Sequence, residues 1–166
     1  MIKEQNVSTF LDAYNKYSSA IYLHCFFRVF SKERAEELEQ ETFMKTWQYL
    51  LDGKEIKTIR PFLYRVAYNL IVDESRKKKS VSLDALLEDS KITEPSYEDY
   101  DSIERSALFK DVINKLLGFN KEEKSIITMR YVDDLEPHAI AEVLGTSPSN
   151  ISVRLHRILA KLKKEF

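Results

Sequence analysis

Cysteine and histidine, the residue types that most often bind metals or act as nucleophiles, are sparse and poorly spaced in this chain. The 166 residues include one cysteine and three histidines. His138 and His156 are far apart, and no acidic or thiol ligand stands at metal-binding spacing from them. Cys25 falls on the apolar stripe of a predicted helix, where a thiol is usually buried and inert. We therefore expect no catalytic residue, no metal and no cofactor.

Recognition of a polyanion is the chemistry that the sequence does indicate, first in residues 136–155. These residues have the spacing of a helix-turn-helix, with the small Ala141 where two helices must cross closely. Gly145 can adopt the positive φ that the turn needs. Ser147 can cap the next helix, and Pro148 suits its first position. The pattern predicts two coupled helices, over residues 137–144 and 148–164.

The second of these helices has an apolar stripe and a polar, basic face. Ile151, Leu155 and Ile158 recur at helical spacing and are expected to hold the helix on the core. The opposite face can enter a major groove and present polar side chains to bases and arginine to guanine or phosphate. The residues predicted to bind DNA here are Ser149, Asn150, Ser152, Val153, Arg154, His156, Arg157 and Lys161. The alternative is an ordinary helical hairpin, because the spacing of the turn residues alone is common.

A second candidate for nucleic-acid binding is the stretch of residues 59–79, in which aromatic and basic residues alternate. Aromatic rings can stack on unpaired bases while cations hold the backbone. The alternative is that the aromatic rings belong to the core, as most aromatic residues in helices do. Arg65, Asn69, Asp73 and Arg76 line up on the face that we expect to be wet. The expected packed face consists of Phe62, Leu63, Val66, Leu70 and Ile71.

The elements that must position these residues are predicted to be helices. Three glycines and four prolines are too few for the many tight turns of an all-β fold. Apolar periodicity predicts helices over about 8–30, 32–51, 58–79, 103–117 and from 121 to about 131. Ser31 is the expected cap of the second, and residues 120–123 fit a capping box.

The charge pattern divides the chain. Residues 80–104 contain eight acidic residues and one lysine, and they lose the helical periodicity apart from a short helix expected at about 83–87. They form an acidic linker between two mildly basic pieces. The chain has no apolar stretch long enough to span a membrane and no apolar signal core at its start. We expect an all-α, cytoplasmic protein of two small helical domains.

Several segments of the sequence resemble those of a known family. Residues 37–47 (ELEQETFMKTW) and 62–76 (FLYRVAYNLIVDESR) resemble region two of the sigma-70 family. Residues 129–131 and the helix-turn-helix resemble region four. The resemblance is to the short, two-domain extracytoplasmic-function (ECF) sigma factors, and it covers about residues 9–79 and 105–164.

The resemblance implies a three- or four-helix region two at residues 1–79, a linker at 80–104 and region four at 105–166. It implies a sigma factor that binds core RNA polymerase, recognises promoter DNA and helps to open the strands. The implied partners are core RNA polymerase, promoter DNA and an anti-sigma factor. We expect the protein not to be embedded in a membrane and not to be an obligate homo-oligomer.

The family's functional positions can be carried over to matching residues of this chain. The polymerase-binding motif corresponds to Glu37, Gln40, Glu41 and Trp47. The minus-ten element would be bound by the loop before the third helix and by that helix, at Lys54, Lys57, Arg60, Tyr64, Arg65, Tyr68, Asn69, Asp73, Arg76 and Lys77. The minus-thirty-five element would be bound by the outward face of the helix-turn-helix described above.

The chain departs from the family's pattern at four positions. Glu39 replaces an apolar or small residue, and Tyr68 replaces an arginine. Ser152 stands where a cation is usual, and Val153 where a serine is usual. We expect these differences to leave the polymerase contact intact, while the promoter sequence that is read does not follow from the resemblance.

Two other functions stay open at the level of sequence. One is a helix-turn-helix regulator that acts without polymerase, although residues 1–79 do not look like a ligand-binding or dimerisation unit. The other is a nucleic-acid-processing enzyme built on Glu36, Glu37, Glu39 and Glu41, for which a solvated charged surface is the simpler explanation.

Overall fold

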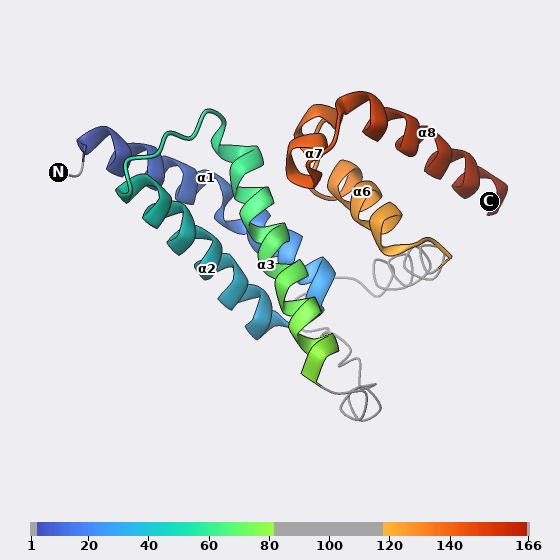
Figure 1. Ribbon diagram of the computed structural model, residues 1–166, viewed down its shortest axis with the longest axis horizontal. Helices are drawn as coiled ribbons and strands as arrows, with labels where there is room; N and C mark the ends of the chain where they lie inside the picture. Colours follow the sequence, from blue (N-terminus) through green and yellow to red (C-terminus); the bar gives the residue numbers. More distant parts are fainter. Residues whose placement is uncertain (1–2, 82–117, 166) are drawn as a thin grey trace, which may run out of the picture. The chain divides into compact units, whose positions relative to one another are not determined.

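The computed structural model describes residues 3–81 and 118–165. The chain divides into two units, residues 1–95 and 96–166, and each is described by itself. All regular structure in the described ranges is helical (Figure 1), which confirms the all-α fold class. The helix expected at 103–117, the one at 83–87 and nearly all of the acidic linker lie outside the described residues.

The first unit is built from three long helices that lie side by side, each in contact with the other two (Figure 1). They are α1 (Glu4–Val29), α2 (Lys32–Leu51) and α3 (Ile59–Val81). Ile21, Cys25, Leu38 and Leu63 form the centre of the core and are fully buried. The inert, buried thiol predicted for Cys25 is confirmed.

Helix α1 begins about a turn earlier than the apolar spacing predicted. The side-chain Nδ2 of Asn6 donates to the backbone oxygen of Leu50 at 3.4 Å, so the extra turn is held by the end of α2. Periodicity within α1 could not reveal a contact of that kind. The helix ends at Phe30, whose φ of 51° is left-handed and whose N–H donates to Phe26 O at 2.8 Å.

Local signals set both ends of α2, as the sequence predicted. The hydroxyl of Ser31 accepts a hydrogen bond from the N–H of Arg34 at 3.3 Å and so caps the first turn. After Leu51 the chain turns through Gly53, whose φ is 79°. Few residues other than glycine adopt that conformation without strain.

Aromatic rings join α1 to the second half of α2. Phe10 contacts Trp47 with ring centroids 5.0 Å apart, and it meets Phe43 edge-on at 6.1 Å. Tyr14 contacts the same Phe43 ring at 5.0 Å. Such pairs stabilise a core beyond their buried area.

Glu39 of α2 is a charged residue that is buried against α1. Its carboxylate accepts a hydrogen bond from the hydroxyl of Ser18 at 2.7 Å, and only 7% of the residue is exposed. A buried carboxylate is costly unless it is hydrogen-bonded, so the hydroxyl of Ser18 offsets part of the cost of burying Glu39.

The second unit contains α6 (Lys121–Tyr131), α7 (Pro137–Leu144) and α8 (Pro148–Glu165), and α6 contacts both of the others. The capping box predicted for α6 is present: Asn120 Oδ1 accepts from Glu123 N at 2.8 Å, and Glu123 accepts from Asn120 N at 3.3 Å. The small core between the three helices is formed by Ile126, Met129, Leu135, Ile140, Ile151 and Ile158.

The turn of the helix-turn-helix has the predicted form. Ala141 is 2% exposed at the crossing of α7 and α8, and Gly145 has a φ of 69°. The Gly145 N–H closes α7 on the carbonyl of Ala141. The hydroxyl of Ser147 then accepts from Asn150 N at 3.2 Å and caps α8.

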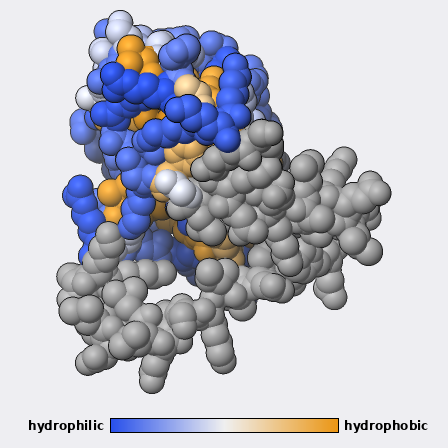
Figure 2. Space-filling model, turned by 90° about the vertical axis from the view of Figure 1, so that its right-hand side faces the viewer, coloured by the Kyte–Doolittle hydropathy of each residue, from blue (hydrophilic) through white to orange (hydrophobic). Residues whose placement is uncertain are grey.

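Two classes of feature are absent from the described residues. None of their helices is long and apolar enough to cross a membrane. Across residues 3–81 and 118–165, no group of three or more metal-ligating side chains comes together. Figure 2 shows a face on which hydrophilic residues cover most of the described surface and hydrophobic ones appear only as separate patches.

Candidate functional site

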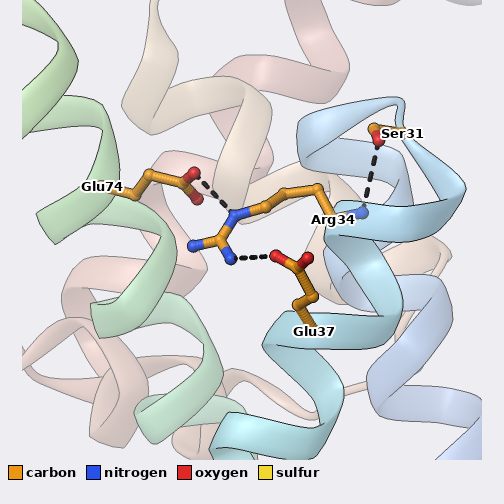
Figure 3. Close-up of polar contacts among 4 residues, drawn as sticks. All are labelled: Ser31, Arg34, Glu37 and Glu74. Carbon is orange, nitrogen blue, oxygen red and sulfur yellow. Dashed lines mark hydrogen bonds and ion pairs between the residues drawn. The ribbon is translucent and has the colours of Figure 1, made fainter.

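The beginning of α2 is fixed by an arginine that bridges two carboxylates (Figure 3). Arg34 Nε donates to Glu74 of α3 at 2.6 Å, and Arg34 Nη1 donates to Glu37 of its own helix at 2.7 Å. The hydrogen bond to Glu74 is the main cause that raises the pKa of the Arg34 guanidinium. The side chain of Glu37 is 64% exposed and that of Glu74 only 20%. Arg34 therefore joins a carboxylate in the solvent to one at the interface between α2 and α3.

The outward face of α2 brings together three of the four residues predicted to bind polymerase. Glu37 and Gln40 are exposed and Glu41 is half-buried, at helical spacings of three and four that place them on one face. We call Glu37, Gln40, Glu41 and Met44 the α2 face. Met44 was not predicted, yet it is 70% exposed, one turn beyond Gln40 and Glu41.

The fourth predicted residue, Trp47, points toward α1. Its ring is half-buried and packs on Phe10. The structure therefore gives Trp47 a packing role, the alternative to direct contact with a partner. The exposure of Met44 could have been predicted from the sequence. An apolar residue three or four positions from polar residues on an amphipathic helix lies on the same, exposed face.

The predicted wet face of α3 is confirmed as exposed. Arg65, Asn69, Asp73 and Arg76 are exposed at successive turns, and Lys77 is exposed beside them. They form one polar stripe along α3, which we call the α3 stripe. Tyr68 lies at its edge and is half-buried.

Tyr64, which was predicted to bind the minus-ten element, is buried in the structure. Its side chain is among the largest that are fully buried, with 1% of the residue exposed. The ring meets His24 of α1 edge-on at 5.1 Å, and the Arg60 guanidinium lies 5.9 Å from the ring centre. A base cannot reach this ring, because α3 packs against α1 at this turn.

The loop before α3 presents cations beside an aromatic pair. Lys54 and Lys57 are exposed, and Lys54 Nζ lies 5.1 Å from the centre of the Tyr49 ring. That ring in turn packs on Phe62 at 4.8 Å. Lys54 is therefore attached to the bundle at its α2–α3 end.

The outward face of α8 consists of short polar, apolar and basic residues. Ser149, Asn150, Ser152, His156 and Arg157 are exposed, and Val153 is 50% exposed among them. The burial of Ile151, Leu155 and Ile158 confirms the expected phase of the helix. The outward face therefore contains residue types that can contact base edges and phosphates.

Two of the predicted DNA-binding cations lie on the flank of α8, where α6 holds them. Arg154 pairs with Glu122, and Lys161 Nζ donates to Glu123 at 3.0 Å. The hydrogen bond from Lys161 is the main cause that lowers the pKa of the Glu123 carboxyl. The Lys161 ammonium also lies 5.9 Å from the centre of the Phe119 ring. These contacts join residues more than thirty positions apart, so helical periodicity could not predict them.

Comparison with known families decides between the functions left open by the sequence. Residues 13–81 match Sigma-70 region 2, and residues 112–162 match Sigma-70, region 4. The chain belongs to the sigma-70 family. It is a sigma factor that acts with core RNA polymerase in transcription initiation, so the free-standing regulator is not favoured. Sigma factors are not enzymes.

Two relatives from Bacillus subtilis agree with this assignment. The RNA polymerase sigma factor YlaC of Bacillus subtilis is 27% identical over 92% of this chain and 89% of its own length. The ECF RNA polymerase sigma factor SigW of the same organism is 26% identical over 99% of this chain and 92% of its own.

A solved structure agrees at the level of the fold. It is that of CnrH in complex with the cytosolic domain of CnrY, which has a TM-score of 0.63 and 20% identity. The match covers 93% of this chain and 85% of that one.

Proposed function

We propose that this sigma factor binds core RNA polymerase through the α2 face. The observation that carries the proposal is the exposure of Met44 at 70%, surrounded by Glu37, Gln40 and Glu41. Protein interfaces combine an apolar core, in which methionine is enriched, with a polar rim. The carboxylates would fix the register and raise the association rate with a basic partner surface, and Met44 would slow dissociation.

We further propose that the first unit meets the minus-ten element with the α3 stripe, Tyr68 and the loop cations. Strand opening costs a few kcal/mol for each unstacked base, and capture of such a base offsets part of that cost. Tyr68 is the aromatic residue left for this role, since Tyr64 is buried and Tyr68 is half-exposed at the edge of the stripe. The exposed cations would hold the phosphate backbone.

The second unit would read the minus-thirty-five element with the outward face of α8. Its N-terminal residues, Ser149, Asn150 and Ser152, are small and polar, which allows close approach to base edges. Arg157 is the exposed cation best placed for guanine or phosphate. Arg154 and Lys161 would act from the flank, because each is paired with a carboxylate of α6.

The partners and location follow from this role. A protein that works on RNA polymerase acts in the cytoplasm. We also propose control by an anti-sigma factor, which the complex of CnrH with the cytosolic domain of CnrY supports by analogy.

The test of the polymerase interface is a charge reversal on the α2 face. Glu41→Lys is preferable to a change at Glu37, because Glu37 accepts a hydrogen bond from Arg34 and its reversal would disturb the fold. We expect Glu41→Lys to weaken binding to purified core RNA polymerase of Bacillus subtilis by about tenfold, or ~1.4 kcal/mol, mostly through slower association. Surface plasmon resonance gives both rate constants.

Asp12→Lys is the matched control, because Asp12 is an exposed carboxylate in the middle of α1. It should leave both rate constants within about twofold of wild type. Equal losses in the two variants, or no loss in either, would contradict the assignment of the α2 face. Met44→Ala in the same assay should mainly raise the dissociation rate.

A further inference from the structure

Val153 is an apolar residue in the middle of the polar face of α8, and half of it is exposed to water. Ser149 precedes it by one turn, while His156 and Arg157 follow by one turn, and all three are exposed. Residues at spacings of three and four lie on one face of a helix, so Val153 is at the centre of the surface that would enter the groove.

The surroundings of Val153 favour a nucleic acid over an apolar protein surface. Protein interfaces concentrate several apolar side chains in one desolvated core. The nearest neighbours of Val153 on the outward face are instead hydroxyl, imidazole and guanidinium groups, which suit phosphates and base edges.

The major groove contains one apolar group that a single valine can match. Among the base edges exposed there, thymine alone carries a methyl group, at C5, and all the other recognition groups are hydrogen-bond donors or acceptors. A valine offers no hydrogen bond, so opposite a donor or acceptor it would leave that group unsatisfied. Opposite a thymine methyl, both apolar surfaces lose contact with water.

We propose that Val153 is a specificity-determining residue that reads the methyl group of a thymine in the minus-thirty-five element, on either strand. This inference rests on the proposed role of α8. Arg157 lies one turn further, a rise of about 6 Å, which corresponds to roughly two base pairs along the duplex. The thymine is therefore read within about two base pairs of the base or phosphate that Arg157 binds.

The experiment removes the methyl group from the DNA and leaves the rest of the base intact. Holoenzyme is assembled from the full chain and core RNA polymerase, and its preferred minus-thirty-five sequence is selected from a randomised duplex library. Each thymine of the selected element, on either strand, is then replaced singly by deoxyuridine. We expect one replacement to weaken wild-type binding about fourfold, the effect of one buried methyl group.

The matching change in the protein is Val153→Ser, which removes the apolar surface at an exposed position. For this variant the ratio of affinities for thymine and deoxyuridine duplexes should fall to about one, and repeated selection should lose the thymine at that position alone. Val132→Ser is the matched control, since Val132 is 47% exposed at the end of α6 and lies off α8. Its ratio should equal that of wild type.

Three results separate the possible failures. If wild-type holoenzyme selects no minus-thirty-five sequence, the proposed role of α8 is wrong. If it selects one but every deoxyuridine duplex binds as tightly as its thymine parent, the role of α8 stands and the inference about Val153 is overturned. If a deoxyuridine effect persists in Val153→Ser, another residue reads the methyl group and the inference is likewise overturned.

Discussion

Helices α3 and α8 are both proposed to meet DNA, yet they offer very different surfaces. Helix α3 packs against two long helices and buries Leu63, Tyr64 and Ala67. The ring of Tyr64 therefore faces the core, and a stripe of charged and amide groups remains outside. Helix α8 packs on two short helices, and small polar residues with Val153 are left exposed. The packing partners thus decide which side chains of a basic helix can reach a nucleic acid.

The ion pairs of the two units differ in how far their side chains are exposed to solvent. Arg34 joins α2 to α3 through Glu74, at groups that are only 32% and 20% exposed. Each pair of α6 with α8 has one partner that is well exposed: Lys161 is 59% exposed against 23% for Glu123, and Glu122 is 57% exposed against 37% for Arg154. An ion pair with a well-exposed partner contributes little stability, so its cation can leave the carboxylate at small cost.

The largest effect that would test this comparison is expected at Tyr64. Tyr64→Ala removes a fully buried ring and should lower the free energy of unfolding of the first unit by about 3–5 kcal/mol. The chain has one tryptophan, Trp47, which lies in the first unit. Urea denaturation followed by its fluorescence therefore reports on that unit alone.

Tyr68→Ala is the matched change one turn along the same helix. Because Tyr68 is half-exposed, its loss should cost about 1 kcal/mol or less in the same denaturation experiment. Strand opening by the holoenzyme, measured by permanganate reactivity of unpaired thymines, should be impaired instead. A Tyr64→Ala protein as stable as wild type would remove the basis for contrasting α3 with α8.

The two tyrosines also show what sequence can and cannot supply. Helix caps, turns and apolar periodicity depend on residues close together in the sequence. The cap at Ser31, the capping box at Asn120 and the positive φ of Gly145 were therefore predictable, and so was the exposed face of α3. Tyr64 and Tyr68 are one turn apart in similar sequence, and their difference in burial depends on His24 of α1. Likewise, the pairing of Arg154 with Glu122 and the contact of Asn6 with Leu50 join distant parts of the chain.

A smaller effect is expected for the two arginines of α8, which looked equivalent in sequence. Arg157 is exposed on the outward face, whereas Arg154 is paired with Glu122 on the flank. Arg157→Ala should weaken holoenzyme binding to promoter duplex by about 1–3 kcal/mol and flatten its dependence on salt. Arg154→Ala should weaken it by less, because Arg154 must leave or share its carboxylate to reach DNA.

Binding isotherms at several salt concentrations check this difference, with binding to core polymerase as the control that should not change. Equal losses for the two variants would mean that Glu122 does not restrain Arg154. The contrast between the flank and the outward face of α8 would then be lost.

The smallest effect concerns the stability of the second unit and its dependence on pH. The pKa of Glu123 is lowered in the folded protein, chiefly by the hydrogen bond from Lys161. A lowered pKa stabilises the fold above the carboxyl's unfolded value, which is about 4.3, and the contribution disappears as pH falls through the folded value. Glu123→Gln removes the charge but keeps an amide that can serve the capping box.

At neutral pH the Glu123→Gln variant should therefore be less stable than wild type by less than about 1 kcal/mol, because the pair is near the surface. This difference in stability should close as pH falls through the folded pKa of Glu123, which lies below the ordinary value of a glutamate. Denaturation followed by circular dichroism measures it, while Trp47 fluorescence in the same samples verifies that the first unit is unchanged. A gap that stays constant with pH would show that the cap, and not the charge pair with Lys161, is what Glu123 contributes. The flank of α8 would then be held to α6 by packing and by the pair of Arg154 with Glu122.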